Sequence, residues 1–180
     1  MKKILFFSLM LIFAISPYIS AKDKGDGRPN GGALSYGEFG RPATLDPVTS
    51  NEMIAVRVVE LLFNSLVGIN AKQEIVPELA EKWEITTDNR TFTFYLRKDV
   101  MWHKTQGAGD DKYLTADDVI YTYNVMTHPK TITPLKLRYE FIQEIKKIDS
   151  HTVQFVLKRP ILNALAKFTF KIIPKHGPQN

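Results

Sequence analysis

The chain has 180 residues, of which 44% are hydrophobic and 24% charged, and these values exclude a chain that is disordered throughout. The formal net charge is +5 at pH 7, but the lysines and arginines are scattered along the chain. A nucleic-acid groove usually needs a clustered basic stripe, so we expect no nucleic-acid partner. There is no cysteine, which excludes disulfides and a cysteine-linked lipid, so a lipoprotein is not expected.

Residues 1–21 have the organisation of a cleavable secretory signal peptide. Lys2 and Lys3 give a positive start, residues 4–15 form an apolar run broken only by Ser8, and Ala21 supplies a small residue at the cleavage site. The apolar run is short for a membrane span, which takes ~20 residues. We therefore expect export to the periplasm; secretion from the cell and an uncleaved anchor helix are the alternatives.

Residues 22–32 contain glycine, proline and charged residues but no apolar residue, and they predict a leader or linker. A first strand is expected at 33–38. A helix is expected at about 52–65, with Ser50 or Asn51 as its N-cap. Its buried face is expected to contain four apolar residues that recur at helical spacing: Ile54, Val58, Leu61 and Leu62.

Alternating apolar residues predict two hairpins further along the chain. The first joins 83–86 to 91–97 through a turn-forming segment, and the second joins 142–148 to 152–158 around Asp149-Ser150-His151. The first hairpin is preceded by a short strand expected at 66–69 and by a turn of helix expected at 77–80. After the second hairpin we expect a short helix at 161–168 and a strand at 170–173.

A helix is predicted to follow Thr115, because Thr115 and Asp118 have capping-box spacing, with aspartate in place of the usual glutamate. Asp117 and Asp118 also suit the positive end of the helix dipole. The buried face of this helix is expected to contain Val119, Ile120, Tyr123 and Met126.

No residue pattern predicts a catalytic site, since the chain has no glycine-rich phosphate loop, no GxSxG elbow and no cysteine nucleophile. His103 could form a metal site with four nearby acids, Asp110, Asp111, Asp117 and Asp118. A loop and a helix cap explain these acids equally well, and His103 has no partner at zincin spacing. We therefore expect no metal, no cofactor and no enzymatic activity.

The stretch TFTFYLRKDVMWH (91–103) places aromatic residues beside charge, as a binding site does. Its alternation indicates a strand with Phe92, Phe94 and Leu96 facing the core. The step Arg97-Lys98-Asp99 then predicts a turn, after which Val100 and Trp102 return to the core. We expect this stretch to be scaffold and to contact no ligand.

Six blocks carry a resemblance to a known family: TLDP (44–47), VELLFNSLVGIN (59–70), VPELAEKWEITTDNRTFTFYLRKDVMWH (76–103), LTADDVIYTYN (114–124), IKKIDSHTVQFVLKRP (145–160) and KIIPKH (171–176). In order and approximate spacing they resemble the amino-terminal part of the family 5 extracellular solute-binding proteins, the periplasmic peptide-binding proteins of ABC importers. The segment 104–113 is longer than in the family and indicates an inserted surface loop.

The resemblance implies a mixed-sheet α/β fold of the type II periplasmic-binding-protein class, in which a ligand lies between two lobes. Family members are much longer, so only an incomplete fold is expected here. Residues 33–44 would supply the first strand of lobe I, residues 45–160 a small α/β subdomain, and residues 161–180 a truncated return into lobe I.

The resemblance also implies ligand-binding residues. In peptide-binding relatives the segment shortly after Leu-Asp-Pro lies along the cleft, and its backbone pairs with the bound peptide. The distance from Leu-Asp-Pro at 45–47 to Leu-Phe at 62–63 matches without a gap, which places Asn51, Glu52 and Met53 at the cleft edge. Leu135 matches a position that faces the ligand in some relatives. The alternative is that Asn51 only caps a helix and Met53 only packs in the core.

By this resemblance the chain is expected to be a monomeric substrate-binding component of an ABC importer. It would capture peptides in the periplasm and deliver them to an inner-membrane permease. The chain alone is expected to bind peptide weakly or not at all, because it would form only half a cleft. Two alternatives stay open: an orphan fragment or interaction module without a transport role, and a metal-dependent hydrolase that uses His103.

Overall fold

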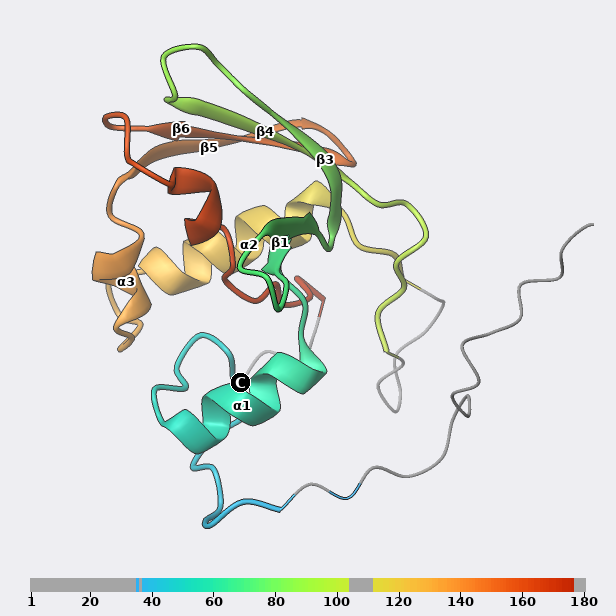
Figure 1. Ribbon diagram of the computed structural model, residues 1–180, viewed down its shortest axis with the longest axis vertical. Coiled ribbons are helices and arrows are strands. Elements are labelled where there is room, and N and C mark those ends of the chain that lie inside the picture. Colours follow the sequence, from blue (N-terminus) through green and yellow to red (C-terminus); the bar gives the residue numbers. More distant parts are fainter. Residues whose placement is uncertain (1–34, 36, 104–111, 177–180) are drawn as a thin grey trace, which may run out of the picture. The chain divides into compact units, whose positions relative to one another are not determined.

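The computed structural model describes residues 35, 37–103 and 112–176 (Figure 1). By its internal contacts the chain divides between Gly37 and Glu38, and all the helices and strands below belong to the part that begins at Glu38. Within the described ranges no helix has the length and apolar character that a membrane span requires.

A four-stranded antiparallel sheet is the largest element of the fold (Figure 1). It contains β3 (Ala80–Ile85), β4 (Thr91–Leu96), β5 (Ile142–Asp149) and β6 (Thr152–Leu157), in the order β3-β4-β6-β5. The two hairpins predicted from alternation are therefore confirmed, and β4 pairs with β6 to join them into one sheet.

The core lies between one face of this sheet and α2 (Ala116–Thr127), which runs along that face (Figure 1). Aromatic rings fill the space: the ring centroid of Phe155 lies 5.8 Å from that of Phe94 and 4.9 Å from that of Phe168. Phe92, Phe94 and Leu96, which the sequence assigned to the core, are buried, and so are the alternating residues Val153, Phe155 and Leu157 on β6.

α2 begins as the sequence predicts. Thr115 is its N-cap, and the Asp118 carboxylate accepts a hydrogen bond from the Thr115 backbone N–H at 2.8 Å, as a capping box requires. On the predicted face Val119 and Met126 are fully buried, whereas Ile120 and Tyr123 are partly buried against the core.

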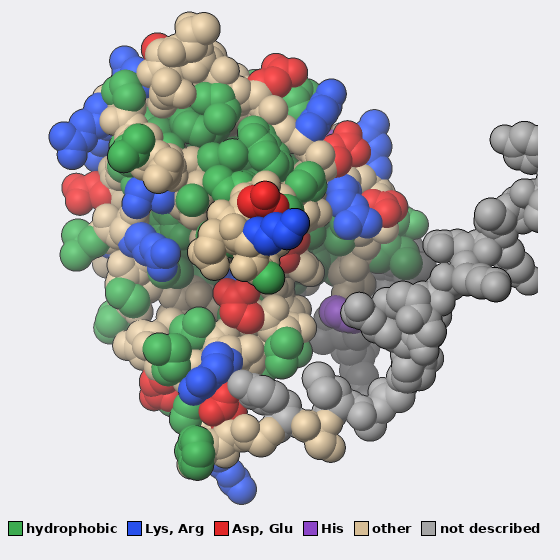
Figure 2. Space-filling view, in the orientation of Figure 1, with side chains coloured by type: hydrophobic (Ala, Val, Ile, Leu, Met, Phe, Trp, Pro, Cys, Tyr) green, Lys and Arg blue, Asp and Glu red, His purple; other side chains and the backbone are tan. Residues whose placement is uncertain are grey.

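α1 (Met53–Leu62) is shorter than predicted, and Glu52 is its N-cap in place of Ser50 or Asn51. The predicted buried face is also wrong in part, because Ala55 and Val59 are buried while Leu61 and Leu62 are 63% and 51% exposed. These two leucines at the end of the helix are therefore left largely exposed by the described residues. Figure 2 shows hydrophobic side chains lying among charged side chains of both signs on one face of the molecule.

The turn of helix predicted at 77–80 is wrong. The strands β1 (Val67–Ile69) and β2 (Ile75–Pro77) form a two-stranded antiparallel sheet instead, and β3 begins at Ala80. Long-range backbone bonds decide this: the N–H groups of Leu79 and Ala80 donate to the carbonyls of Ser65 and Leu66 at 3.0 and 2.9 Å. These bonds override the local helix preference of the segment. The strand predicted at 66–69 is confirmed as β1.

The C-terminal part of the described chain also differs from the prediction. The helix expected at 161–168 is a short 3₁₀ helix, η1 (Ala164–Lys167), and the strand expected at 170–173 is reduced to one bridge between Lys171 and Ser65. A side chain takes the place of a neighbouring strand, because the Ile173 N–H donates to Thr122 Oγ1 at 3.0 Å.

One helix was not predicted, and one predicted strand is largely undescribed. The sequence did not predict α3 (Leu135–Arg138), a single helical turn. The strand predicted at 33–38 falls mostly outside the described residues, and Ser35, Gly37 and Glu38 are in no strand.

Candidate ligand-facing site

The segment that precedes α1 is held in shape by Asp46. Its carboxylate accepts hydrogen bonds from the Val48 N–H at 2.9 Å and from the Thr49 hydroxyl at 2.8 Å. The Asp46 carbonyl also accepts from the Ser50 N–H at 2.9 Å. Aspartate commonly orders a turn in this way, and the turn it forms explains why Ser50 does not cap the helix.

Asn51, Glu52 and Met53 follow this turn and are all exposed, with Met53 70% exposed. The first N–H groups of a helix have no partner within it, and the Glu52 side chain does not cap this one. The Glu52 carboxylate is directed back along the chain, where it accepts from the Ala43 N–H at 3.4 Å. The start of α1 therefore presents backbone N–H donors at the surface, which an extended ligand could use.

Thr133 links the turn before Asn51 to the start of α3, where Leu135 lies. The Thr133 hydroxyl donates to the Val48 carbonyl at 2.5 Å and accepts from the Leu135 N–H at 3.2 Å. Val48 and Thr133 are 85 positions apart in sequence, and Leu135 is half-buried at the start of α3. Thr133 was not predicted as part of the site, because nothing local to a threonine in a loop indicates a partner so distant.

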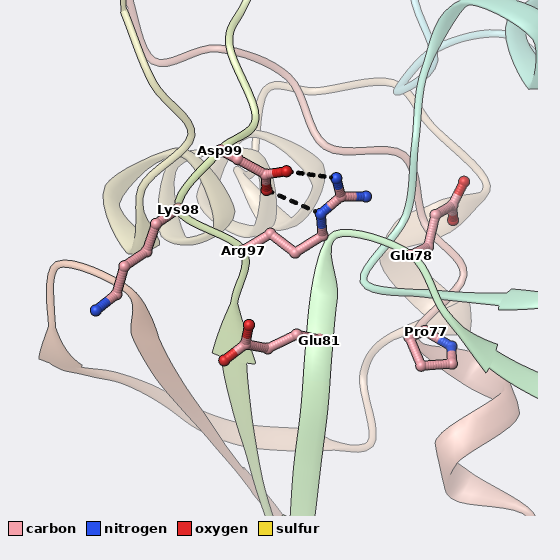
Figure 3. A pocket seen from close by; sticks show the side chains of 6 residues that line it. All are labelled: Pro77, Glu78, Glu81, Arg97, Lys98 and Asp99. Atoms are coloured by element: carbon pink, nitrogen blue, oxygen red, sulfur yellow. Dashed lines mark hydrogen bonds and ion pairs between the residues drawn. The ribbon is translucent and has the colours of Figure 1, made fainter. Parts of the chain in front are cut away.

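The charged stretch after β4 forms a turn, as the sequence predicts (Figure 3). Arg97 and Asp99 make a two-fold hydrogen-bonded ion pair, with Nε–Oδ1 and Nη2–Oδ2 distances of 3.0 and 2.9 Å, while the Lys98 side chain points away from them. The hydrogen bond from Arg97 lowers the pKa of Asp99, and the same bond raises the pKa of Arg97. Arg97 and Asp99 therefore satisfy each other's charge, which supports a scaffold role.

The described residues give no geometric support to the hypothetical metal site at His103. Asp117 pairs with Lys147 at 2.6 Å, and this hydrogen bond lowers the pKa of Asp117. Asp118 is buried in the helix cap. No group of three potential ligands is close enough to hold a metal ion among the residues described, and Asp110 and Asp111 lie outside them.

Comparison with known proteins assigns the chain to a family. Residues 74–179 match the model for bacterial extracellular solute-binding proteins, family 5 (middle region). The chain belongs to this family. The resemblance of the sequence blocks is thus confirmed, and the family is one of solute-binding proteins rather than one defined by a reaction.

Among similar proteins, the dipeptide-binding protein of Escherichia coli K12 is 39% identical over 111 residues, covering 55% of this chain and 21% of the relative. Di/tripeptide-binding protein 1 of Pseudomonas aeruginosa is 34% identical over 139 residues, which cover 69% of this chain and 26% of the relative. The solved structure of HbpA2 from Haemophilus parasuis aligns with a TM-score of 0.69 at 26% identity. The alignment covers 76% of this chain and 30% of HbpA2. This family 5 chain thus spans between about a fifth and a third of the length of these relatives, which accords with the incomplete type II fold expected from the sequence.

Proposed function

We propose that this family 5 chain is part of the substrate-binding component of an ABC importer and contributes one wall of a peptide-binding cleft. The single observation that carries the proposal is the Thr133 link, which holds the segment before Asn51 and the start of α3 side by side. The names of its relatives, which bind dipeptides and tripeptides, favour a short peptide as ligand.

The proposed contact is made mainly by the backbone. A peptide in extended form pairs its own N–H and C=O groups with free backbone groups of the protein, so the side chains at these positions matter little. Asn51, Glu52 and Met53 are exposed at a helix start, as such pairing requires. The part of the Leu135 side chain that is not packed against the core would offer apolar surface to the ligand.

The proposal extends to the organisation of the chain. Residues 1–21 would be a cleavable signal peptide for export to the periplasm and 22–32 a leader, and the mature chain would work as a monomer beside an inner-membrane permease. Residues 33–44 and 161–180 would belong to lobe I, and 45–160 would form the small subdomain. One wall of a cleft cannot exclude water from a ligand, so the chain alone should bind peptide weakly or not at all.

Isothermal titration calorimetry of the chain with a mixed pool of di- to pentapeptides tests the last statement. We expect no measurable heat or only weak binding. Micromolar binding by the isolated chain would show that the remaining length of the relatives is not needed, and the half-cleft proposal would be wrong.

The backbone contact is tested in a chimera in which residues 38–176 replace the matching segment of the E. coli dipeptide-binding protein. Met53 is the first residue of α1, where proline is tolerated although it removes the N–H. Met53→Pro should therefore weaken dipeptide binding by about fivefold while keeping the helix, since one hydrogen bond to a ligand contributes about 1 kcal/mol. Met53→Ala, which keeps the N–H, is the matched control and should bind normally; equal affinities for the two variants would refute the contact.

A further inference from the structure

A second recess lies on the same part of the chain, between α1, β1, α3 and the segment that follows η1. Its volume is about 370 Å³, within the range of small-molecule sites. Its charged lining residues are Glu60, Glu78, Arg138 and Lys171. The charges balance, so the hydrogen bonds that these groups already make decide which ligand the recess can accept.

Both carboxylate oxygens of the acidic residue Glu78 already accept hydrogen bonds from the protein. One carboxylate oxygen accepts from the Asn64 side-chain amide at 2.6 Å, and the other accepts from the Ser65 backbone N–H at 2.8 Å. The Ser65 hydroxyl donates to the Thr169 carbonyl at 3.0 Å. These hydrogen bonds hold the framework of the recess, and the Glu78 carboxylate can offer a ligand only acceptors.

The two basic residues have donors to spare. The Lys171 side chain is only 10% exposed, and its ammonium lies 2.6 Å from a carboxylate oxygen of Glu60, which is itself 59% exposed. An ammonium group has three donors, and Lys171 makes no second hydrogen bond or ion pair with a described residue. The Arg138 guanidinium makes no hydrogen bond or ion pair with any residue in the described ranges, although it has five donors.

We propose that this recess binds the carboxylate of a small ligand, either the carboxyl terminus of a short peptide or a free amino acid. The unused hydrogen-bond donors among the charged lining residues lie on two cations, and arginine binds carboxylates through paired hydrogen bonds. Glu60 is the competitor, because a bound carboxylate would share Lys171 with it. Glu60 lies on the same face of α1 as Met53 and about 10 Å further along the axis, so this site is separate from the backbone contact and goes beyond the proposed function.

Nuclear magnetic resonance titration of the full chain tests the site, with the backbone amides of Gly68 and Ile69 as reporters. The probes are Ala-Ala, alanine and Ala-Ala-amide, the last of which has no carboxylate. We expect Ala-Ala or alanine, but not the amide, to shift the reporters, and the probe that binds more tightly identifies the source of the carboxylate. A response to all three probes alike, or to none, would overturn the proposal.

Three variants separate recognition from structure. Arg138→Gln should weaken binding on the order of tenfold, because a charge-assisted hydrogen bond is lost, while Lys136→Gln on the same exposed turn should leave it unchanged. Glu60→Gln should strengthen binding by removing the competing carboxylate, which a purely structural role of Glu60 would not produce. Unchanged affinity in Arg138→Gln would overturn the assignment. Shifts at Met53 and Leu135 without shifts at Gly68 would also overturn it while leaving the proposed function intact.

Discussion

The helices α1 and α2 both have apolar residues at helical spacing, but they differ in what packs against them. Phe155 on β6 and Val119 on α2 are fully buried against each other's layer, whereas α1 leaves Leu61 and Leu62 mostly exposed. Within the described chain the sheet and α2 bury each other's apolar faces, whereas the apolar residues at the end of α1 have no such partner layer. An apolar stripe thus shows which face of a helix can be buried, but the stability it gives depends on the partner that packs against it.

The largest expected effect comes from the region of the sheet and α2. Phe155→Ala should lower the free energy of unfolding by about 3–5 kcal/mol, because it removes a ring packed against Phe94 and Phe168 and leaves a cavity. Urea unfolding followed by circular dichroism measures this. Leu61→Ala is the control on α1 and should cost less than about 1 kcal/mol, since the side chain is largely exposed. Equal losses in the two variants would contradict the contrast between the regions.

The next effect concerns the link between α2 and the C-terminal segment. The buried Asp118 carboxylate accepts from the Thr115 N–H and, with its other oxygen, from the Lys175 N–H at 2.8 Å. In Asp118→Asn the side chain is neutral and has only one oxygen, so it cannot accept both hydrogen bonds. The substitution should lower the free energy of unfolding by about 2–3 kcal/mol. Asp117→Asn next to it breaks only an exposed pair with Lys147 and should cost about 0.5 kcal/mol. A reversed order would mean that the buried carboxylate does not hold this segment.

Thr133→Val should have a smaller effect on stability, about 1 kcal/mol, because one hydroxyl is removed at nearly constant shape. Its local effect should be larger: hydrogen exchange should accelerate at the Leu135 amide, which has lost its acceptor. Thr131→Val in the same loop is the control, since its hydroxyl makes no hydrogen bond to a described residue. Unchanged exchange in Thr133→Val would mean that the two segments are held together by other contacts.

The smallest effect on unfolding free energy is expected from the exposed end of α1. The double variant Leu61→Ser, Leu62→Ser should change stability by no more than about 1 kcal/mol, because these side chains bury little surface. It should reduce self-association, since exposed apolar patches favour aggregation. Light scattering over a concentration series measures this, and unchanged self-association would show that this face is not the cause.

Local sequence signals predicted the parts of the fold that local interactions determine. The Thr115–Asp118 spacing located the start of α2, and strict alternation located β4 and β6 with the correct buried residues. The errors arose where a distant group decided the outcome. Pro77–Ala80 looks helical by itself, but it pairs with Ser65 and Leu66, and Ile173 is held by Thr122 on α2 rather than by a strand.

The candidate site likewise has one part that the sequence could indicate and another that depends on the folded chain. Exposed backbone at Asn51–Met53 follows from the turn that Asp46 forms, which a sequence can indicate. The role of Thr133 and the recess around Lys171 depend on segments that meet only in the folded chain, so no local pattern indicates them. The placement of Asn51, Glu52, Met53 and Leu135 against a ligand stays a prediction.

Dipeptide titration calorimetry on the chimera with the E. coli dipeptide-binding protein, with the isolated chain titrated in parallel, tests the central claim most directly. If residues 38–176 form one wall of a peptide-binding cleft, the chimera should bind with micromolar affinity or better, and the isolated chain should give little or no heat. A chimera that unfolds cooperatively but fails to bind dipeptide would contradict the claim.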